Sequence, residues 1–272
     1  MLTKKQITNL GSLAAKIRLD ALSMVCRVHT SHIGSAYSIV ELLVYLYEKG
    51  LRRKGKNKNL HDRFILSKGW GCSTLYAILA HEGIIKKSLL KEYCGNGSLL
   101  SGTASQNGLP GIEATTGSMG HGLPIAVGMA LAAKMKQIKQ RIVVVMGDGE
   151  LNEGSVWEGL LQAAHHKLDN LTVIIDRNGW QSFGRTKDIL DPEPLTDKFK
   201  AFGYGVSMID GHDFAAIDTA FLKQKKNMPN IIIAKTIKGK GVSLFEDNNA
   251  WHYKTPNAQE EIQARSELLK HI

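Results

Sequence analysis

The hydrophobic pattern of the chain alternates short, largely apolar runs with longer segments of helical spacing. Residues 142–146 are a continuous apolar run, and residues 171–175 are apolar apart from Thr172, which is typical of strands buried on both faces of a sheet. Residues 152–167 between them have helical spacing, with Asn152 as the expected cap. Strand, helix and strand in this order predict a βαβ unit, whose crossover brings both strand ends to one edge of the sheet.

The same pattern predicts an α/β fold for the rest of the chain. Further strands are expected at residues 63–67, 205–209 and 231–235, an amphipathic surface helix at 3–29, and helices at 39–47, 123–136, 214–224 and 258–270. No linker composition divides the sequence. We therefore expect residues 1–272 to form a single domain, a doubly wound, mostly parallel sheet with helices on both faces.

Composition narrows the possible partners. Lys plus Arg exceeds Asp plus Glu by 35 to 25, a net charge of +10, but the basic residues are scattered. The densest clusters, residues 52–54 and 223–226, lack interleaved aromatic residues, so we expect no nucleic-acid binding. Three widely spaced cysteines without a CxxC motif indicate a reducing compartment. Because no apolar run reaches membrane-spanning length and no signal-peptide core is present, we expect a cytoplasmic protein with no membrane contact.

Polar residues follow the two central strands at the edge where the strands end. Asp148 and Gly149 come directly after the first strand, and Asn178 comes directly after the second. A carboxylate and an amide oxygen make a sparse Mg²⁺ site. Waters and phosphate oxygens commonly supply the remaining ligands of such an ion. Gly149 lets a phosphate approach the backbone, and the helix that follows favours negative charge. Gly-Asp-Gly is also common in turns, so the strand context is what favours metal binding.

These residues resemble the thiamine-diphosphate signature of transketolases. The resemblance is strongest over residues 147–184 and runs from about Leu13 to His252. It is closest to the N-terminal half of split transketolases, in which the two halves are separate chains. The resemblance implies thiamine diphosphate and Mg²⁺ as cofactors, with Asp148, Asn178 and the backbone carbonyl of Trp180 as metal ligands.

Two further segments carry the resemblance. Residues 115–122 match the family motif that lies along the thiamine cofactor, which implies cofactor contacts for Gly117, Ser118 and Met119. Split forms often have a histidine at the position of His121. Glu153 matches a glutamate that links the two active sites of a dimer. From the residues alone, a flexible helix entry and a dipole-stabilising glutamate explain these positions equally well.

The resemblance also identifies two departures from the family. His32 matches a histidine that contacts the sugar, and His252 matches one that contacts the diphosphate and the substrate. Trp70, however, stands where the family has a histidine on the cofactor's diphosphate side, and Thr103 stands where it has a donor-binding histidine. Because the cofactor motif is intact, we expect a specialised sugar or sugar-phosphate substrate, such as a modified or nucleotide-linked sugar.

The resemblance implies transfer of a two-carbon ketol unit between sugars. The glutamate that activates the cofactor belongs to a pyrimidine-binding domain in this family, and the chain ends without one. We therefore expect a C-terminal transketolase-like partner subunit in an α2β2 heterotetramer. Two alternatives remain. The missing histidines allow a thiamine-dependent decarboxylase or acyloin synthase that acts on a 2-oxo acid. A cofactor-free regulatory subunit is less favoured because Asp148, Gly149 and Asn178 persist.

Overall fold

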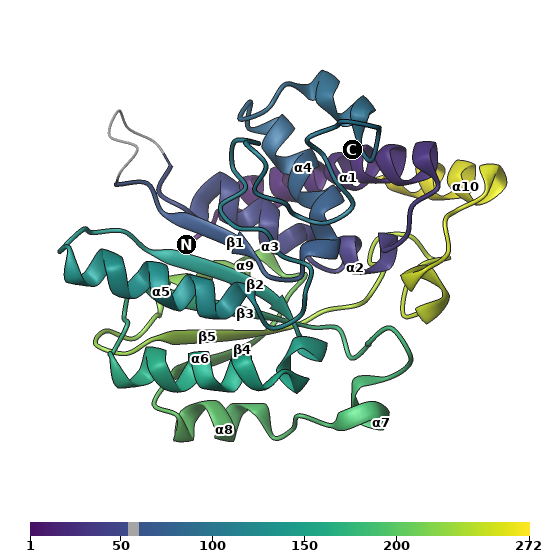
Figure 1. The fold of residues 1–272 in the computed structure, drawn as a ribbon. Helices are drawn as coiled ribbons and strands as arrows, with labels where there is room; N and C mark the ends of the chain where they lie inside the picture. The colour runs from purple at the N-terminus through teal and green to yellow at the C-terminus, as the bar shows by residue number, and fades with distance from the viewer. Residues whose placement is uncertain (54–59) are drawn as a thin grey trace.

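Five parallel strands form one sheet in the computed structural model, which describes residues 1–53 and 60–272. The order across the sheet is β1-β2-β3-β5-β4, as Figure 1 shows. The strands are β1 (Arg63–Leu66), β2 (Ile142–Gly147), β3 (Leu171–Arg177), β4 (Gly205–Asp210) and β5 (Asn230–Lys235). All five were expected from the sequence, and the doubly wound α/β prediction is confirmed. Lys54, part of a predicted basic cluster, lies outside the described residues.

Helices cover both faces of this sheet (Figure 1). They are α1 (Lys4–Val28), α2 (Ile33–Tyr37), α3 (Val40–Tyr45), α4 (Cys72–His81), α5 (Gly122–Met135), α6 (Gly154–His165), α7 (Thr186–Leu190), α8 (Leu195–Ala201), α9 (Phe214–Leu222) and α10 (Ala258–Leu269). Alternate residues of β2 pack into two hydrophobic cores, one on each face of the sheet, because successive side chains of a strand point to opposite faces. Val143 and Val145 pack with α1, α3, α4 and α9, whereas Val144 packs with α5, α6 and α8.

Two helix predictions are wrong in detail. Asn152 does not cap a helix: residues Asp148–Asn152 form a 3₁₀ turn, and α6 begins only after Glu153. The turn winds tightly because the Glu150 carboxylate accepts a hydrogen bond from the backbone N–H of Gly147 at 3.0 Å. The helix expected at 39–47 divides, since α3 ends at Tyr45 and a π-helical turn, Leu46–Gly50, follows.

The first helix is more deeply buried than its amphipathic pattern predicts. In the second half of α1, Ala21, Leu22, Met24 and Val25 are fully buried. They are covered because α3, α4 and α10 all pack on this helix. Even this helix of 25 residues does not qualify as a membrane span, and no other helix among the described residues is long and apolar enough to cross a membrane.

Candidate functional site

The predicted metal-binding residues lie at the carboxyl edge of the sheet, where β2 and β3 end side by side. The register pairs Gly147, the last residue of β2, with Asp176, and β3 ends one residue later at Arg177. Asp148 follows Gly147 directly, and Asn178 lies two residues after Asp176. The βαβ crossover inferred from the sequence thus brings Asp148 and Asn178 to neighbouring strand ends.

Asp148 is a buried carboxylate whose hydrogen-bond donors, within the described part of the chain, are all neutral. It is 3% exposed and accepts hydrogen bonds from the backbone N–H of Gly149 at 3.0 Å, from the backbone N–H of Gly179 at 2.9 Å and from the Thr186 hydroxyl at 3.1 Å. Burial, with the nearby charge of Asp176, raises the pKa of Asp148 to about 7. Such a carboxylate is stabilised by any cation that reaches it.

Asn178 lies against both Asp176 and the loop that follows β3. Its amide nitrogen donates to Asp176 Oδ2 at 3.1 Å, which fixes the orientation of the side chain. Its amide oxygen accepts from the backbone N–H of Trp180 at 2.9 Å. Asn178 and Trp180 are therefore in contact, and Gly179 between them donates to Asp148. The three predicted metal-binding positions share one short network.

A buried ion pair that the sequence did not reveal lies beneath this network. Lys68 and Asp176 are each almost fully buried and form a short ion pair. Ser38 donates to Asp176 at 2.6 Å, and Lys68 also donates to the carbonyl of Ser35 at 3.1 Å. Burial alone raises the pKa of Asp176, but the charge and hydrogen bond of Lys68 outweigh it and hold that pKa below its usual value. This pair connects the loop after β1 to the end of β3, of which Asp176 is part.

His32 and His252 meet at the same edge, beside a second buried lysine. The backbone N–H of His32 donates to the carbonyl of His252 at 2.9 Å, and their ring centroids are 4.9 Å apart. The ammonium of Lys238 lies 2.9 Å from His252 Nδ1 and 2.6 Å from Asn249 Oδ1. Burial and nearby lysines lower the pKa of His32 to about 4 and that of His252 to about 3. Both imidazoles are therefore neutral near pH 7 and can exchange hydrogen bonds with hydroxyl groups.

Lys238 differs from Lys68 because no carboxylate among the described residues pairs with it. It is 1% exposed, and the two side chains that accept its hydrogen bonds are neutral. Burial, with repulsion from Lys68, lowers the pKa of Lys238 to about 7. A desolvated ammonium without a counter-ion favours the arrival of an anion.

The glycine-rich loop over residues 115–122 packs against the turn that carries Trp70. A Cβ atom at Gly69 would lie 2.7 Å from the backbone of Gly117, so the two segments touch through their main chains. Gly117 has a φ of +123° and also faces Thr103, whose Cγ2 would lie 2.9 Å from an added Cβ. Trp70 is half-buried near the end of β2. Close backbone packing therefore brings together the two positions at which the chain departs from the family.

Glu150 holds three parts of the site together. Its buried carboxylate accepts from the Ser67 hydroxyl at 2.6 Å, from the backbone of Gly147 at 3.0 Å and from that of Gly120 at 3.1 Å. Glu153 lies beneath Gly120, where an added Cβ would approach Glu153 Cβ to 2.6 Å. Gly120 also has a φ of +78°, which favours glycine. Of the other motif residues, Met119 and His121 are exposed, the former by 43%.

The donor set fits thiamine diphosphate with a divalent cation. Over residues 1–53 and 60–272, the site holds a carboxylate without a cation at Asp148 and an ammonium without an anion at Lys238. In the same part of the chain, the Gln181 amide nitrogen is buried without a hydrogen-bond partner, and this side chain packs 3.1 Å from where a Cβ of Gly149 would lie. A metal ion would satisfy the first group, and diphosphate oxygens would satisfy the other two.

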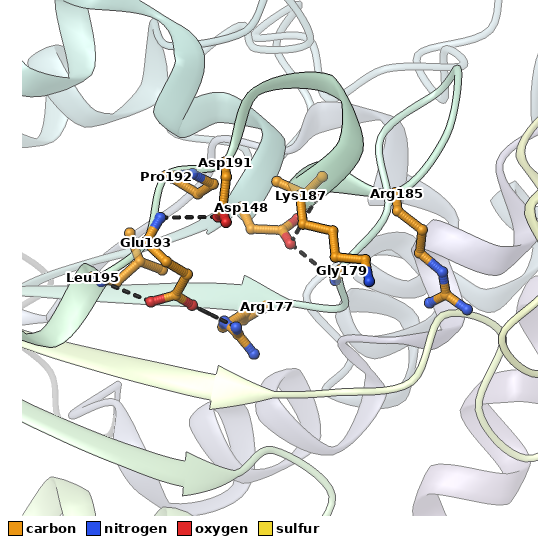
Figure 2. A pocket seen from close by; sticks show the side chains of 10 residues that line it. Asp148, Arg177, Gly179, Arg185, Lys187, Asp191, Pro192, Glu193 and Leu195 are labelled. Atoms are coloured by element: carbon orange, nitrogen blue, oxygen red, sulfur yellow. Dashed lines mark hydrogen bonds and ion pairs between the residues drawn. The ribbon is translucent and has the colours of Figure 1, made fainter.

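Asp148 also borders a cavity of about 440 Å³ on the side of α7 and α8. Figure 2 shows the carboxylate at the wall of this cavity, between the end of β3 and the segment that leads to α8. Across it, Arg177 and Glu193 face one another as an ion pair. Arg177 is therefore engaged and leaves the charge of Asp148 uncompensated.

Comparisons with known proteins show which proteins the chain is similar to. The family model described as "Transketolase, thiamine diphosphate binding domain" matches residues 11–270. The chain is 43% identical over 240 residues to one of the subunits of apulose-4-phosphate transketolase from Actinobacillus succinogenes, covering 87% of each chain. It is 38% identical to 6-deoxy-6-sulfo-D-fructose transketolase subunit SqwG of Clostridium sp. strain MSTE9, covering 91% of this chain and 92% of that one.

Solved structures show the same fold. Transketolase from Campylobacter jejuni has a TM-score of 0.89 and 30% sequence identity, covering 95% of this chain and 42% of that chain. Transketolase from Leishmania mexicana has a TM-score of 0.88 and 27% identity, covering 95% and 41%. The chain thus spans about two fifths of the length of these solved transketolases.

Proposed function

Because the chain belongs to the transketolase family, we propose that it is the diphosphate-binding subunit of a two-chain, thiamine-diphosphate-dependent transketolase. We treat residues 1–272 as one diphosphate-binding domain. The observation that carries the proposal is the burial of Asp148 and Lys238, each with only neutral hydrogen-bond partners among the described residues, at the edge where β2 and β5 end. When bound, the cofactor supplies the carbon nucleophile for transfer of a ketol unit.

We assign the cofactor contacts to residues that meet at this edge. Asp148, Asn178 and the backbone carbonyl of Trp180 would hold Mg²⁺, and Gly149 leaves room for the diphosphate. Lys238 and Gln181 would donate to diphosphate oxygens, because both are buried donors that lack an anionic acceptor among the described residues. The loop with Gly117, Ser118 and Met119, together with the indole of Trp70, would line the thiamine.

We assign substrate hydroxyl groups to the two neutral imidazoles. When protonated, Lys238 can only donate to His252 Nδ1, which places the proton of neutral His252 on Nε2, where it can donate to a sugar hydroxyl. His32 lies 4.9 Å from it, centroid to centroid, which allows both rings to contact one sugar. Glu153, at the start of α6, is assigned to communication with a second active site.

The proposed substrate is a specialised sugar phosphate. Trp70 and Thr103 replace two family histidines, so the pocket offers fewer groups that bind and shuttle protons for common ketose phosphates. Two of the relatives are named for apulose 4-phosphate and 6-deoxy-6-sulfo-D-fructose, which supports a modified sugar. Neither is named as a decarboxylase or acyloin synthase, so ketol transfer is favoured over the 2-oxo-acid alternative.

A partner chain is part of the proposal. Relatives that match over most of their length are named as single subunits of their transketolases, which implies a second chain in those enzymes. We propose that a C-terminal subunit with a pyrimidine-binding domain completes the site in an α2β2 heterotetramer, located in the cytoplasm. The isolated chain should then be inactive.

The test is reconstitution with the co-purified partner, followed by steady-state assays of a panel of ketose and modified-ketose donors. We expect activity only from the complex with Mg²⁺ and thiamine diphosphate. With xylulose 5-phosphate and ribose 5-phosphate we expect kcat/KM below about 10⁴ M⁻¹s⁻¹, the lower end for efficient enzymes. Efficient turnover by the single chain would refute the two-chain proposal, and efficient use of pentose phosphates would refute the specialised substrate.

A further inference from the structure

Three side chains form a compact cluster at the carboxyl edge, which we call the clasp: Trp180, Arg185 and Asp247. Arg185 donates two hydrogen bonds to the Asp247 carboxylate, at 2.7 and 2.6 Å. The guanidinium carbon of Arg185 lies 3.8 Å from the centre of the Trp180 ring. The indole N–H of Trp180 donates to Asp247 Oδ1 at 2.7 Å. Each member therefore contacts the other two, through a bidentate ion pair, a cation–π contact and a hydrogen bond.

The clasp joins the segment that follows β3 to the segment that follows β5. Asp247 is fixed to the second segment because its backbone N–H donates to the carbonyl of Lys238 at 2.8 Å. Its φ of +52° is uncommon for a residue other than glycine, and such strain persists where surrounding contacts enforce it. In the first segment, Thr186 follows Arg185 directly and donates to Asp148 at 3.1 Å. The clasp thus connects the backbone beside Lys238 to the backbone beside Asp148.

A second link runs parallel to the clasp. The amide nitrogen of Asn249 donates to the carbonyl of Ser182 at 3.0 Å, and its amide oxygen accepts from Lys238 at 2.6 Å. Ser182 lies in a tight turn that closes through a hydrogen bond from Gln181 to Gly184 at 2.9 Å. The turn that carries the buried amide donor of Gln181 is therefore attached at two points to the segment that carries Lys238.

We propose that Arg185 and Asp247 are positioning residues that hold residues 179–186 closed over the cofactor site and slow the loss of thiamine diphosphate and Mg²⁺. The inference rests on the proposed function, since it presumes that this site binds the cofactor. In Figure 2, Arg185 lines the cavity but its guanidinium points away from Asp148, so it acts on Asp148 through the segment that it anchors. The Arg185 and Asp247 side chains are 37% and 55% exposed, so the effect should be moderate.

An exposed ion pair elsewhere in the chain provides a matched control. Arg63 and Glu113 are 3.0 Å apart, with side chains 35% and 21% exposed. Arg63 begins β1 and therefore lies at the opposite edge of the sheet from Asp148. Glu113→Gln removes an ion pair of similar exposure without touching the cofactor site. It reports what the loss of one surface charge does by itself.

The first measurement is calorimetric titration of the cofactor-free complex of the full chain and its partner with thiamine diphosphate at saturating Mg²⁺. We expect Asp247→Asn to raise Kd about 3- to 10-fold, mainly through faster release, and Glu113→Gln to change it less than about 2-fold. Arg185→Lys keeps the positive charge but loses the bidentate hydrogen bonds to Asp247 and the stacking on Trp180, so it should also weaken binding of thiamine diphosphate. The double variant should be no worse than the weaker-binding single variant, because both remove one interaction.

The second measurement is the rate of tryptic cleavage after Arg185 and Lys187 in the cofactor-free complex. Asp247→Asn should speed this cleavage several-fold, whereas Glu113→Gln should leave it unchanged. If Asp247→Asn does not fold, the rate of cleavage after Lys187 is measured in the milder variant Arg185→Lys instead. Unchanged cleavage, or unchanged Kd in both clasp variants, overturns the clasp alone. Failure of the wild-type complex to bind thiamine diphosphate overturns the proposed function and, with it, the role of the clasp.

Discussion

Both edges of the sheet contain a buried aspartate, and the two are treated in opposite ways. At the amino edge, Asp62 is 2% exposed and accepts from Arg52 and Arg141, from their guanidinium groups and their backbone N–H groups alike. At the carboxyl edge, Asp148 is 3% exposed and, among the described residues, has only neutral donors. The same residue type at the same depth is thus paired with two cations at one edge and left without a cationic partner at the other.

The difference shows in the pKa of each carboxyl group. Burial raises the pKa of Asp62, but hydrogen bonds from Arg52 and Arg141 outweigh it and hold the pKa below its usual value. Burial, with the charge of Asp176, raises the pKa of Asp148 to about 7. An ion pair that is complete within the chain stabilises the fold, whereas an incomplete one destabilises it until a ligand arrives. The carboxyl edge therefore suits a cationic ligand, whereas the ion pairs at the amino edge stabilise the fold.

The largest expected effect is on cofactor binding. Asp148→Asn removes the one acidic metal ligand that we assign, so the affinity of the reconstituted complex for thiamine diphosphate with Mg²⁺ should fall at least about 1000-fold, or about 4 kcal/mol. The fold should persist, because the amide can still accept from Gly179 and Thr186. Calorimetry checks the affinity, and circular dichroism checks the fold. Wild-type affinity in this variant would remove Asp148 from the metal site.

The matched change at the other edge should affect folding instead. Asp62→Asn leaves Arg52 and Arg141 without their shared carboxylate and places an amide N–H against a donor. We expect a loss of about 3 kcal/mol in the free energy of unfolding. Urea unfolding of the full chain measures it. The thiamine-diphosphate affinity of the folded complex should stay the same, and a loss of affinity comparable to that of Asp148→Asn would contradict the contrast between the edges.

The two aspartates should also give stability profiles of opposite slope in the metal-free chain. The folded-state pKa of Asp148 lies above the unfolded value of about 4, so the folded state binds more protons and loses stability as pH rises toward 7. Over the upper half of the range from about pH 4 to pH 7, the free energy of unfolding of the wild type should fall by about 2 kcal/mol relative to that of Asp148→Asn. The folded-state pKa of Asp62 is lowered, so its contribution is present above about pH 4 and is lost as pH falls below it. Urea unfolding in the presence of a chelator, for both Asn variants and wild type across this range, measures both slopes.

The elements that position the site could be predicted because local sequence dictates them. Largely apolar runs predicted β2 and β3, and the parallel crossover rule then placed Asp148 and Asn178 at one edge. Helix α4 was missed, since its apolar run begins directly after Gly71 and reads as the continuation of a turn. The cap at Asn152 was wrong because Glu150 bonds back to Gly147, a contact that propensity does not reveal.

The charges of the site could not be predicted, because their partners come from distant parts of the chain. Lys68 lies in a short polar stretch that reads as solvated, yet Asp176 neutralises it across 108 residues of sequence. Lys238 lies in a similar Lys-Gly turn, and only the fold shows that it is buried among neutral partners. The sequence therefore indicated which strand ends carry the site. Burial and long-range pairing decide which charged side chains lack a partner within the chain and can bind a ligand.

The smallest expected effect compares two amides, one at each edge. Gln140, at the amino edge, donates to the carbonyl of His61 at 2.7 Å, whereas the buried Gln181 amide nitrogen has no partner within the described residues. Replacing each by Leu should therefore have opposite signs in the cofactor-free chain. Gln140→Leu removes a satisfied hydrogen bond and should cost about 1 kcal/mol, whereas Gln181→Leu removes an unsatisfied donor and should be neutral or stabilising by up to about 1 kcal/mol. With thiamine diphosphate bound, the order should reverse, because only Gln181 gains an acceptor. Thermal unfolding of each variant complex with and without cofactor gives the four values, and equal cofactor-induced shifts in wild type and Gln181→Leu would show that this donor does not face the diphosphate.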